Sequence, residues 1–131
     1  MEGQVKEAKV LIVDDDKSVR DFLARFLKHK GYTSVISVST GQEALEIIKK
    51  GDIKLALLDI KLPDMDGIEV LRKIKELKKE TNVVMITGFP DEDTAKDALK
   101  LGAYDYIVKP FDLAYLELCL FTKIGAMERK Y

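Results

Sequence analysis

The segment that decides the fold is KVLIVDDDKSVRDFLARFLKHKGYTSVISV, residues 9–38. It starts with a short apolar run, passes through three aspartates into an amphipathic stretch, and returns to a run of β-branched residues after Gly31. Apolar residues in the amphipathic stretch recur every three or four positions, which is the period of a helix, and glycine is a frequent helix terminator. A strand, a helix and a second strand joined so closely predict a β-α-β unit with parallel strands.

The rest of the sequence repeats this alternation, so that five strand-helix units follow one another. Right-handed crossovers between parallel strands leave few arrangements for five such units. The order 2-1-3-4-5 is the usual one, and we therefore predict an α/β fold with a single (βα)5 doubly wound parallel sheet of the flavodoxin-like type. The predicted strands are Lys9–Val13, Thr33–Val38, Lys54–Leu58, Val83–Thr87 and Tyr104–Val108.

Capping residues mark the ends of the predicted helices. The second helix begins after Thr40, because Glu43 three residues later completes a capping box, and it ends at Gly51. The other predicted boundaries are residues 18–30 for the first helix, a cap at Asp66 for the third, a cap at Asp91 or Asp93 and an end at Gly102 for the fourth, and a start after Pro110 for the fifth.

Apolar stripes predict which faces of the later helices are buried. The stripe of the third helix consists of Ile68, Leu71, Ile74 and Leu77, and that of the fifth consists of Leu113, Leu116, Leu120 and Ile124. The tail at 128–131 has no such pattern, and we expect an N-terminal extension at 1–8, one domain at 9–126 and a tail or linker at 127–131.

The composition is that of an ordinary soluble globular domain. Of the 131 residues 47% are hydrophobic and 34% are charged, and the net charge of -1 comes from interspersed signs, so neither disorder nor a direct nucleic-acid surface is indicated. The single cysteine, Cys119, excludes an internal disulfide and fits a reducing compartment. With no signal-peptide pattern and no apolar run long enough for a bilayer, we expect a cytoplasmic protein without a membrane span.

Carboxylates gather where the predicted strands end. Asp14, Asp15 and Asp16 follow the first strand, and Asp59 follows the third. In this topology ligands bind beyond the carboxyl ends of the strands, where the winding reverses between the first and third strands. Two carboxylates about 5 Å apart repel by roughly 3 kcal/mol at an effective dielectric of 20, so the cluster requires a cation or a proton. Oxygen ligands of this kind suit Mg²⁺.

Two further polar residues end the fourth and fifth strands at the same edge. Thr87 supplies a hydroxyl and Lys109 an ammonium group. An aspartate beside a metal can act as a nucleophile and form an acyl phosphate, while the cation and a lysine neutralise the transferred oxygens. Any one of these residues alone is more often a turn former or a solvated side chain, but four at one edge favour a phosphoryl site.

The segments VLIVDDD, LLDIKLPDMDG, MITG and YIVKPF occur in the order and spacing of a known family. The chain resembles the receiver domain of two-component response regulators from about Lys9 to Ile124. The resemblance implies that Asp59 is the phosphoacceptor. It also implies a metal site formed by Asp15 directly, by Asp14 largely through water, by Asp59, and by the backbone carbonyl of Lys61. Thr87, Tyr106 and Lys109 resemble the switch and phosphoryl-binding residues.

Several neighbouring residues resemble the family's shaping positions or depart from its usual choices. Pro63 and Gly67 resemble the loop after the acceptor, and the resemblance implies a cis peptide bond between Lys109 and Pro110. Lys61 and Phe89 depart from the commonest small or polar residues and are expected to tune the lifetime of the phosphoryl group in a direction the sequence does not fix. Asp16 lies beyond the acidic pair and is interpreted as a cap or turn residue.

The family resemblance implies a signalling function without turnover of a separate substrate. A sensor histidine kinase or a phosphotransfer protein would donate the phosphoryl group, with Mg²⁺ or in its place Mn²⁺ bound. The surface of the fourth helix, fifth strand and fifth helix would then change and control an effector or a fused output domain, with a phosphorylation-dependent homodimer left open. The stretch GFPDEDTAKDALKLGAYDYIVKPFDL also resembles receivers attached to transcriptional activators.

Three alternatives stay open at this point. An acid-phosphatase-like hydrolase would also use an aspartyl nucleophile, but it usually has Asp-x-Asp after one strand and a lid. A flavodoxin-like cofactor carrier would place backbone donors, not acids, in the first turn. A degenerate receiver would act only as a protein-binding module. This alternative is disfavoured because every position of the phosphorylation site holds the residue type that the family uses there.

Overall fold

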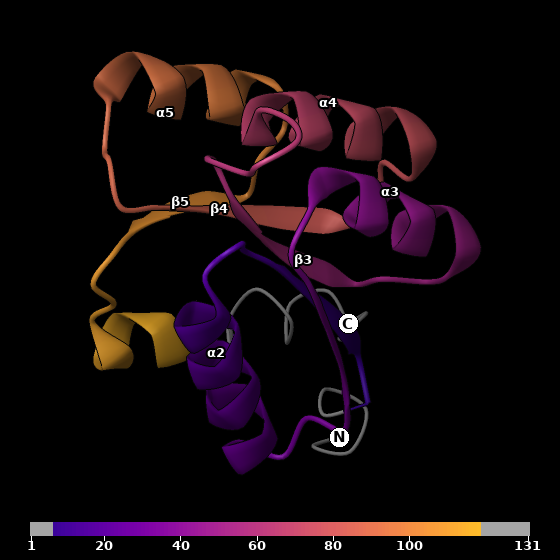
Figure 1. Cartoon of the computed structure of the whole chain (residues 1–131), viewed down its shortest axis with the longest axis vertical. Helices are drawn as coiled ribbons and strands as arrows, with labels where there is room; N and C mark the ends of the chain where they lie inside the picture. Colours follow the sequence, from indigo (N-terminus) through magenta and orange to yellow (C-terminus); the bar gives the residue numbers. More distant parts are fainter. Residues whose placement is uncertain (1–6, 119–131) are drawn as a thin grey trace, which may run out of the picture.

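The computed structural model describes residues 7–118, and Figure 1 shows a central sheet with helices on both of its faces. The last part of this range, 113–118, is helical. The other elements, in chain order, are β1 (Lys9–Val13), α2 (Lys17–His29), β2 (Ser34–Val38), α3 (Gly41–Lys50), β3 (Leu55–Asp59), α4 (Gly67–Leu77), β4 (Asn82–Thr87), α5 (Glu92–Lys100) and β5 (Asp105–Val108).

The five strands form one parallel sheet in the order β2-β1-β3-β4-β5, which confirms the predicted topology. β1 therefore lies between β2 and β3, and its last residue, Val13, pairs with Val38 on one side and Leu58 on the other. β2, β4 and β5 differ from the predicted strands by one residue at one end, and β3 is shifted by one residue at both ends. These are end residues, where apolarity is a weak guide because a strand ends where its ladder of hydrogen bonds ends.

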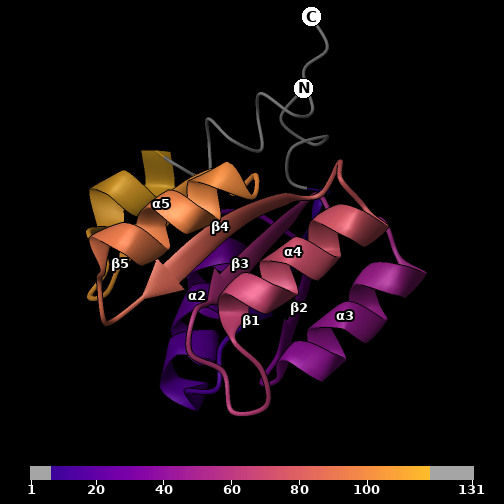
Figure 2. The same ribbon diagram turned by 90° about the horizontal axis from the view of Figure 1, so that it is seen from above.

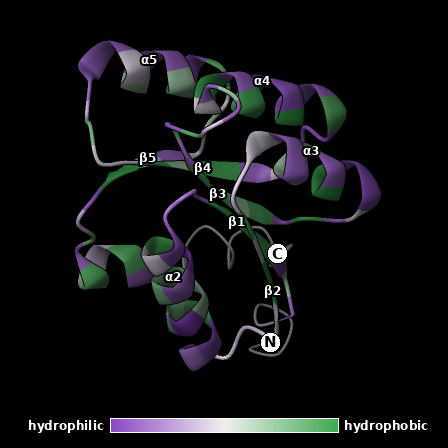
Figure 3. Cartoon of the chain, viewed as in Figure 1, coloured by the Kyte–Doolittle hydropathy of each residue, from purple (hydrophilic) through white to green (hydrophobic). Residues whose placement is uncertain are grey.

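Two apolar cores cover the two faces of the sheet. Successive residues of β1 alternate between them, because Val10 and Ile12 face α2 and the C-terminal helix while Leu11 and Val13 face α3, α4 and α5. Figures 1 and 2 show these two layers of helices on opposite sides of the strands. Burial on both faces explains why the central strands are apolar between their end residues, as the green strand interiors in Figure 3 show.

Each labelled helix begins at a polar cap. The N-caps of α2, α3, α4 and α5 are Asp16, Thr40, Asp66 and Asp91, and each side chain accepts a hydrogen bond from a backbone N–H in the first turn. The Glu43 N–H donates to the Thr40 hydroxyl at 3.1 Å, which is one half of the predicted capping box, and the Glu43 side chain accepts from the N–H of Ser39, the residue before the cap, at 3.1 Å. The cap residues were predicted correctly, with Asp91 chosen over Asp93.

The helix boundaries lie within one or two residues of the predicted ones, but one residue of the predicted stripe in α4 was wrong. α2 runs from Lys17 to His29, one residue ahead of the prediction, and α5 ends at Lys100, with Gly102 two residues beyond it. In α4, Val70 is fully buried, whereas Leu77 at the last position is 43% exposed. Val70 is buried because α4 packs between α3 and α5, so its buried face is wider than one sheet-facing row. Leu77 is the last residue of the helix, where fewer neighbours cover a side chain.

The structure describes the first part of the C-terminal helix, at 113–118. Leu116 is buried at 1% exposure, as predicted, but Leu113 in the first turn is 52% exposed, so that part of the prediction was wrong. The first turn of a helix at the edge of a domain has fewer neighbours to cover it. Leu120, Ile124, Cys119 and the tail at 127–131 lie outside the described residues, as does most of the 1–8 extension. Within residues 7–118, no helix is both long and apolar enough for a transmembrane segment.

Candidate functional site

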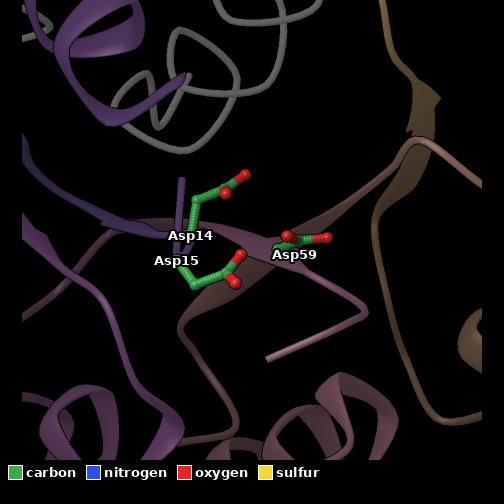
Figure 4. Close-up of side chains that lie close together, drawn as sticks. All are labelled: Asp14, Asp15 and Asp59. Carbon is green, nitrogen blue, oxygen red and sulfur yellow. The ribbon is translucent and has the colours of Figure 1, made fainter. Parts of the chain in front are cut away.

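Three carboxylates meet at the carboxyl edge of the sheet. Asp14 and Asp15 follow β1, and Asp59 is the last residue of β3, the strand next to β1. Each offers an oxygen, and these oxygens lie within 4.8 Å of one another (Figure 4). Asp14 is fully buried and Asp59 is 5% exposed, whereas Asp15 is exposed. The adjacent ends of two parallel strands thus produce the predicted cluster.

Two cationic side chains contact this cluster. The Lys109 Nζ, which follows β5, lies 2.8 Å from Asp14 Oδ2 and 3.5 Å from Asp59 Oδ2. Arg20 on α2 donates from its guanidinium group to the Asp14 backbone carbonyl at 2.8 Å. Asp14 and Asp59 therefore share the Lys109 ammonium group as an ion-pair partner. With Asp15 beside them, the three carboxylates outnumber this one ammonium group, which leaves the cluster short of positive charge.

The electrostatics of the cluster favour a proton or a metal ion on it. Burial, and next the negative charge of Asp14, raise the pKa of Asp59 to about 6. Burial opposes the charge of Lys109, but its hydrogen bond to Asp14 and the attraction of both carboxylates outweigh burial and raise the pKa of Lys109. The lysine therefore stays charged, whereas the Asp59 carboxylate is held in an environment that disfavours its charged form.

The two hydroxyl residues of the predicted switch are held by the segment between β4 and α5. Thr87 is 1% exposed, and its Oγ1 accepts a hydrogen bond from the Phe89 N–H at 2.9 Å. Tyr106 on β5 is half-buried against the core under α3, α4 and α5, and its hydroxyl accepts from the Asp91 N–H at 3.4 Å. Both hydroxyls thus accept hydrogen bonds from backbone N–H groups of the segment between β4 and α5.

The loop after Asp59 is packed closely beneath the cluster. The Lys61 N–H donates to Asp59 Oδ1 at 3.3 Å, and the Gly67 N–H donates to the Ile60 carbonyl at 2.7 Å. A Cβ at Gly67 would lie 2.3 Å from the Asp59 carbonyl oxygen, so only glycine permits this approach. Pro63 is exposed in the same loop.

The structure also shows contacts at this edge that the sequence analysis missed. Phe89 and Lys61 were expected to flank the phosphoryl group, but their mutual contact was not foreseen: the Lys61 ammonium lies 4.4 Å from the centre of the Phe89 ring. The hydrogen bond of Arg20 to Asp14 was missed as well, although a basic residue in the first turn of the helix after the acids was visible in the sequence. The peptide bond between Lys109 and Pro110 is cis, as expected.

The chain belongs to the response regulator receiver domain family, whose sequence pattern it matches over residues 10–120. It is 40% identical over 123 residues to the regulatory protein VanR of Enterococcus faecium, covering 94% of this chain and 51% of VanR. It is 36% identical over 105 residues to sporulation initiation phosphotransferase F of Bacillus subtilis (strain 168), covering 80% and 84% of the two chains.

A solved structure has the same fold. It is a CheY-like response regulator receiver domain protein from Methanospirillum hungatei JF-1, with a TM-score of 0.90 and 34% identity, covering 95% of this chain and 99% of that one. Among curated relatives, the chain spans about half of VanR. Membership of the receiver family identifies a response-regulator receiver domain and favours it over the hydrolase and cofactor-carrier alternatives.

Proposed function

We propose that Asp59 is the phosphoacceptor of this receiver domain. The observation that carries the proposal is the position of its carboxylate, which is buried at the end of β3, within 4.8 Å of two other carboxylates and 3.5 Å from the Lys109 ammonium. A nucleophile needs a site that binds the transferred oxygens as well as itself, and the single lysine beside three acids leaves the charge balance to a divalent cation.

The residues present fit a hard divalent cation. All candidate ligands are oxygens, and Mg²⁺ is usually held by one or two carboxylates with several retained waters. Asp14, Asp15, Asp59 and the Lys61 backbone carbonyl would hold Mg²⁺, and Mn²⁺ can substitute. When bound, the cation supplies positive charge that neutralises the oxygens of the transferred phosphoryl group.

The reaction that we propose is a phosphoryl transfer from nitrogen to oxygen. A carboxylate oxygen of Asp59 forms the new O–P bond while the P–N bond to a phosphohistidine of the donor breaks, and the departing imidazole nitrogen keeps the bonding pair. The Lys109 ammonium, already close to the Asp59 carboxylate, remains charged and attracts the phosphoryl oxygens. The domain thus promotes its own phosphorylation and dephosphorylation and is not an enzyme for a separate substrate.

Phosphorylation would act on the output surface through Thr87 and Tyr106. The Thr87 hydroxyl is bonded to the Phe89 N–H and would leave it for a phosphoryl oxygen, after which Tyr106 would turn into the vacated space. The surface concerned consists of α5, β5 and the C-terminal helix. This surface carries exposed apolar side chains, which are those of Leu99, Tyr104, Val108 and Leu118.

The partners follow from this role. We propose that a sensor histidine kinase or a phosphotransfer protein donates the phosphoryl group in the cytoplasm. The domain, at 9–126, would then pass the signal to a fused output domain or to a separate effector. A transcriptional output is supported by the likeness to the transcriptional regulatory protein ZraR of Klebsiella oxytoca, to which the chain is 38% identical over 115 residues and of which it covers 26%. A phosphorylation-dependent homodimer through the output surface is a further outcome to test.

Incubation of the chain with phosphoramidate tests this proposal. Intact mass is followed with and without Mg²⁺, for the parent and for Asp59→Asn. We expect a magnesium-dependent gain of one phosphoryl group in the parent and none in the variant. No gain in the parent under any small donor would instead support a receiver that binds partners without phosphorylation.

A further inference from the structure

Asp64 joins the loop after β3 to the N-terminal end of α3. Its Oδ1 accepts a hydrogen bond from the Gly41 N–H at 2.9 Å, and its Oδ2 accepts one from the Gln42 N–H at 2.9 Å. Gly41 and Gln42 are the first two residues of α3, and their N–H groups have no partner within the helix. The next N–H, that of Glu43, is bonded to the Thr40 side chain at 3.1 Å. The N-terminal end of α3 is thus capped both by Thr40 and by Asp64, which lies more than twenty positions away in the sequence.

The packing around Gly41 shows that this contact is close. A Cβ at Gly41 would lie 2.8 Å from the Met65 Sδ and 2.8 Å from Val70 Cγ2, which is closer than real Cβ contacts. The loop therefore rests on the bare backbone of Gly41. The hydrogen bonds from Gly41 and Gln42 also lower the pKa of Asp64, so it is ionised at neutral pH and both bonds are charge-assisted.

The same loop contacts the Asp59 carboxylate. The Lys61 N–H donates to Asp59 Oδ1 at 3.3 Å, and Lys61 also pairs with Asp66 in an isolated antiparallel bridge. The loop at 60–66 is therefore closed at its base below Asp59, while its tip is bonded to α3 through Asp64. A displacement of the tip would move the N–H group that orients one oxygen of Asp59.

We propose that Asp64 is a positioning residue for Asp59: its two bonds to α3 fix the loop that orients the Asp59 carboxylate and preorganise the cluster for a divalent cation. This inference rests on the proposed function of the cluster. Asp64 does not contact the carboxylates itself and acts through the Lys61 backbone. A loop that must be ordered at the moment of binding lowers affinity, so loss of the tether weakens cation binding.

Calorimetric titration with Mg²⁺ tests the proposal on three variants of the full chain. Asp64→Ala removes both acceptors, Asp64→Asn keeps one acceptor oxygen, and Thr40→Ala removes a cap from the same helix end without touching the loop. We expect the Mg²⁺ dissociation constant to rise roughly three- to tenfold in Asp64→Ala, a little less than for a residue bonded directly to a ligand. Asp64→Asn should be intermediate, and Thr40→Ala should bind like the parent.

Phosphorylation kinetics provide a second readout. With phosphoramidate, Asp64→Ala should need more Mg²⁺ for half-maximal rate but should reach the rate of the parent at saturating Mg²⁺, because the reacting groups are intact. Urea unfolding of each variant establishes that it is folded under the assay conditions. A general loss of stability would not produce this separation between metal requirement and maximal rate.

The outcomes separate this inference from the proposed function. Equal dissociation constants in the parent and Asp64→Ala overturn it, and so does an equal rise in Thr40→Ala, which would mean that any weakening of α3 affects the site. Asp15→Asn is measured in the same series. If Asp15→Asn loses Mg²⁺ binding while Asp64→Ala keeps it, the inference alone fails. If the parent takes up no Mg²⁺, the inference and the proposed metal site fail together.

Discussion

The Lys109 ammonium lies 2.8 Å from Oδ2 of the fully buried Asp14, and so it joins the end of β5 to the end of β1 across two intervening strands. The same ammonium lies 3.5 Å from Asp59. Removing it would leave two buried carboxylates without an ion-pair partner, which is far more costly than losing an exposed pair.

We therefore expect Lys109→Met to lower the free energy of unfolding at pH 8 by about 2 kcal/mol in metal-free buffer. Urea unfolding measures this difference. Lys17→Met is the matched control, because Lys17 pairs with Asp21 on the surface at 78% and 51% side-chain exposure. The control should change stability by less than about 0.5 kcal/mol. Equal effects of the two substitutions would show that the buried cluster gains nothing from its lysine.

The raised pKa of Asp59 predicts a pH-dependent effect of Asp59→Asn. The folded-state pKa of about 6 lies above the ordinary value of 3.8, so the folded state favours the protonated form. The stability from this group is complete below about pH 4 and is lost as the pH rises through about 6. With 1.36 kcal/mol for each pKa unit, the loss approaches about 3 kcal/mol at pH 8.

Asp59→Asn removes this loss and should therefore stabilise the metal-free protein at pH 8 by up to about 3 kcal/mol, with little effect near pH 4. The measurement is urea unfolding of both proteins across this pH range in the presence of a chelator. A difference between the two proteins that does not change with pH would contradict the raised pKa.

The contact of Phe89 with Lys61 predicts an effect on the lifetime of the aspartyl phosphate. Phe89 is 68% exposed, and the Lys61 ammonium lies 4.4 Å from the centre of its ring, so the two residues connect the loop after β3 with the loop after β4. Phe89→Ala should shorten the lifetime several-fold, roughly as expected when attacking water gains access to a protected group. Intact mass after removal of excess donor measures the decay.

Phe89→Leu distinguishes bulk from the interaction with the ring face. Leucine keeps most of the apolar volume but has no aromatic face for the lysine. An intermediate lifetime would assign a share to each effect. A lifetime equal to that of the parent in Phe89→Ala would show that this contact does not shield the phosphoryl group.

The hydrogen bond between the Phe89 N–H and the Thr87 hydroxyl predicts how the switch is uncoupled. Thr87→Ala lacks the hydroxyl that would move to the phosphoryl group, so Asp59 should still be phosphorylated but α5 and β5 should respond less. Amide chemical shifts of Tyr106 and of residues in α5, recorded with and without phosphoramidate, measure the response. Shift changes as large as those in the parent would refute the relay through Thr87.

Sequence-local signals were sufficient for most of the fold. The caps at Asp16, Thr40 and Asp66 act within a few residues of themselves, and the strands are short apolar runs, so both can be read from adjacent positions. The cluster of Asp14 and Asp59 was also predictable, because parallel strands bring their carboxyl ends to one edge whatever the details of packing.

Features that depend on contacts between distant segments were missed. Asp64 bonds to residues 22 and 23 positions earlier in the chain, and nothing near it in the sequence distinguishes it from an ordinary turn residue. Leu77 fits the helical period but is exposed, because burial at each position of α4 depends on the elements that pack against it and not on the period alone. The pKa of Asp59 likewise depends on the depth of its burial, which no pattern of residue types specifies.

The most direct test of the account is to locate the phosphoryl group itself. The phosphorylated chain is reduced with borohydride, which converts an aspartyl phosphate to homoserine, and is then digested and sequenced by mass spectrometry. We predict homoserine at position 59 in the parent, dependent on Mg²⁺ during phosphorylation and absent from Asp59→Asn. Homoserine at position 14 or 15 instead, or a phosphorylated chain without any homoserine, would contradict the assignment of Asp59 as the acceptor.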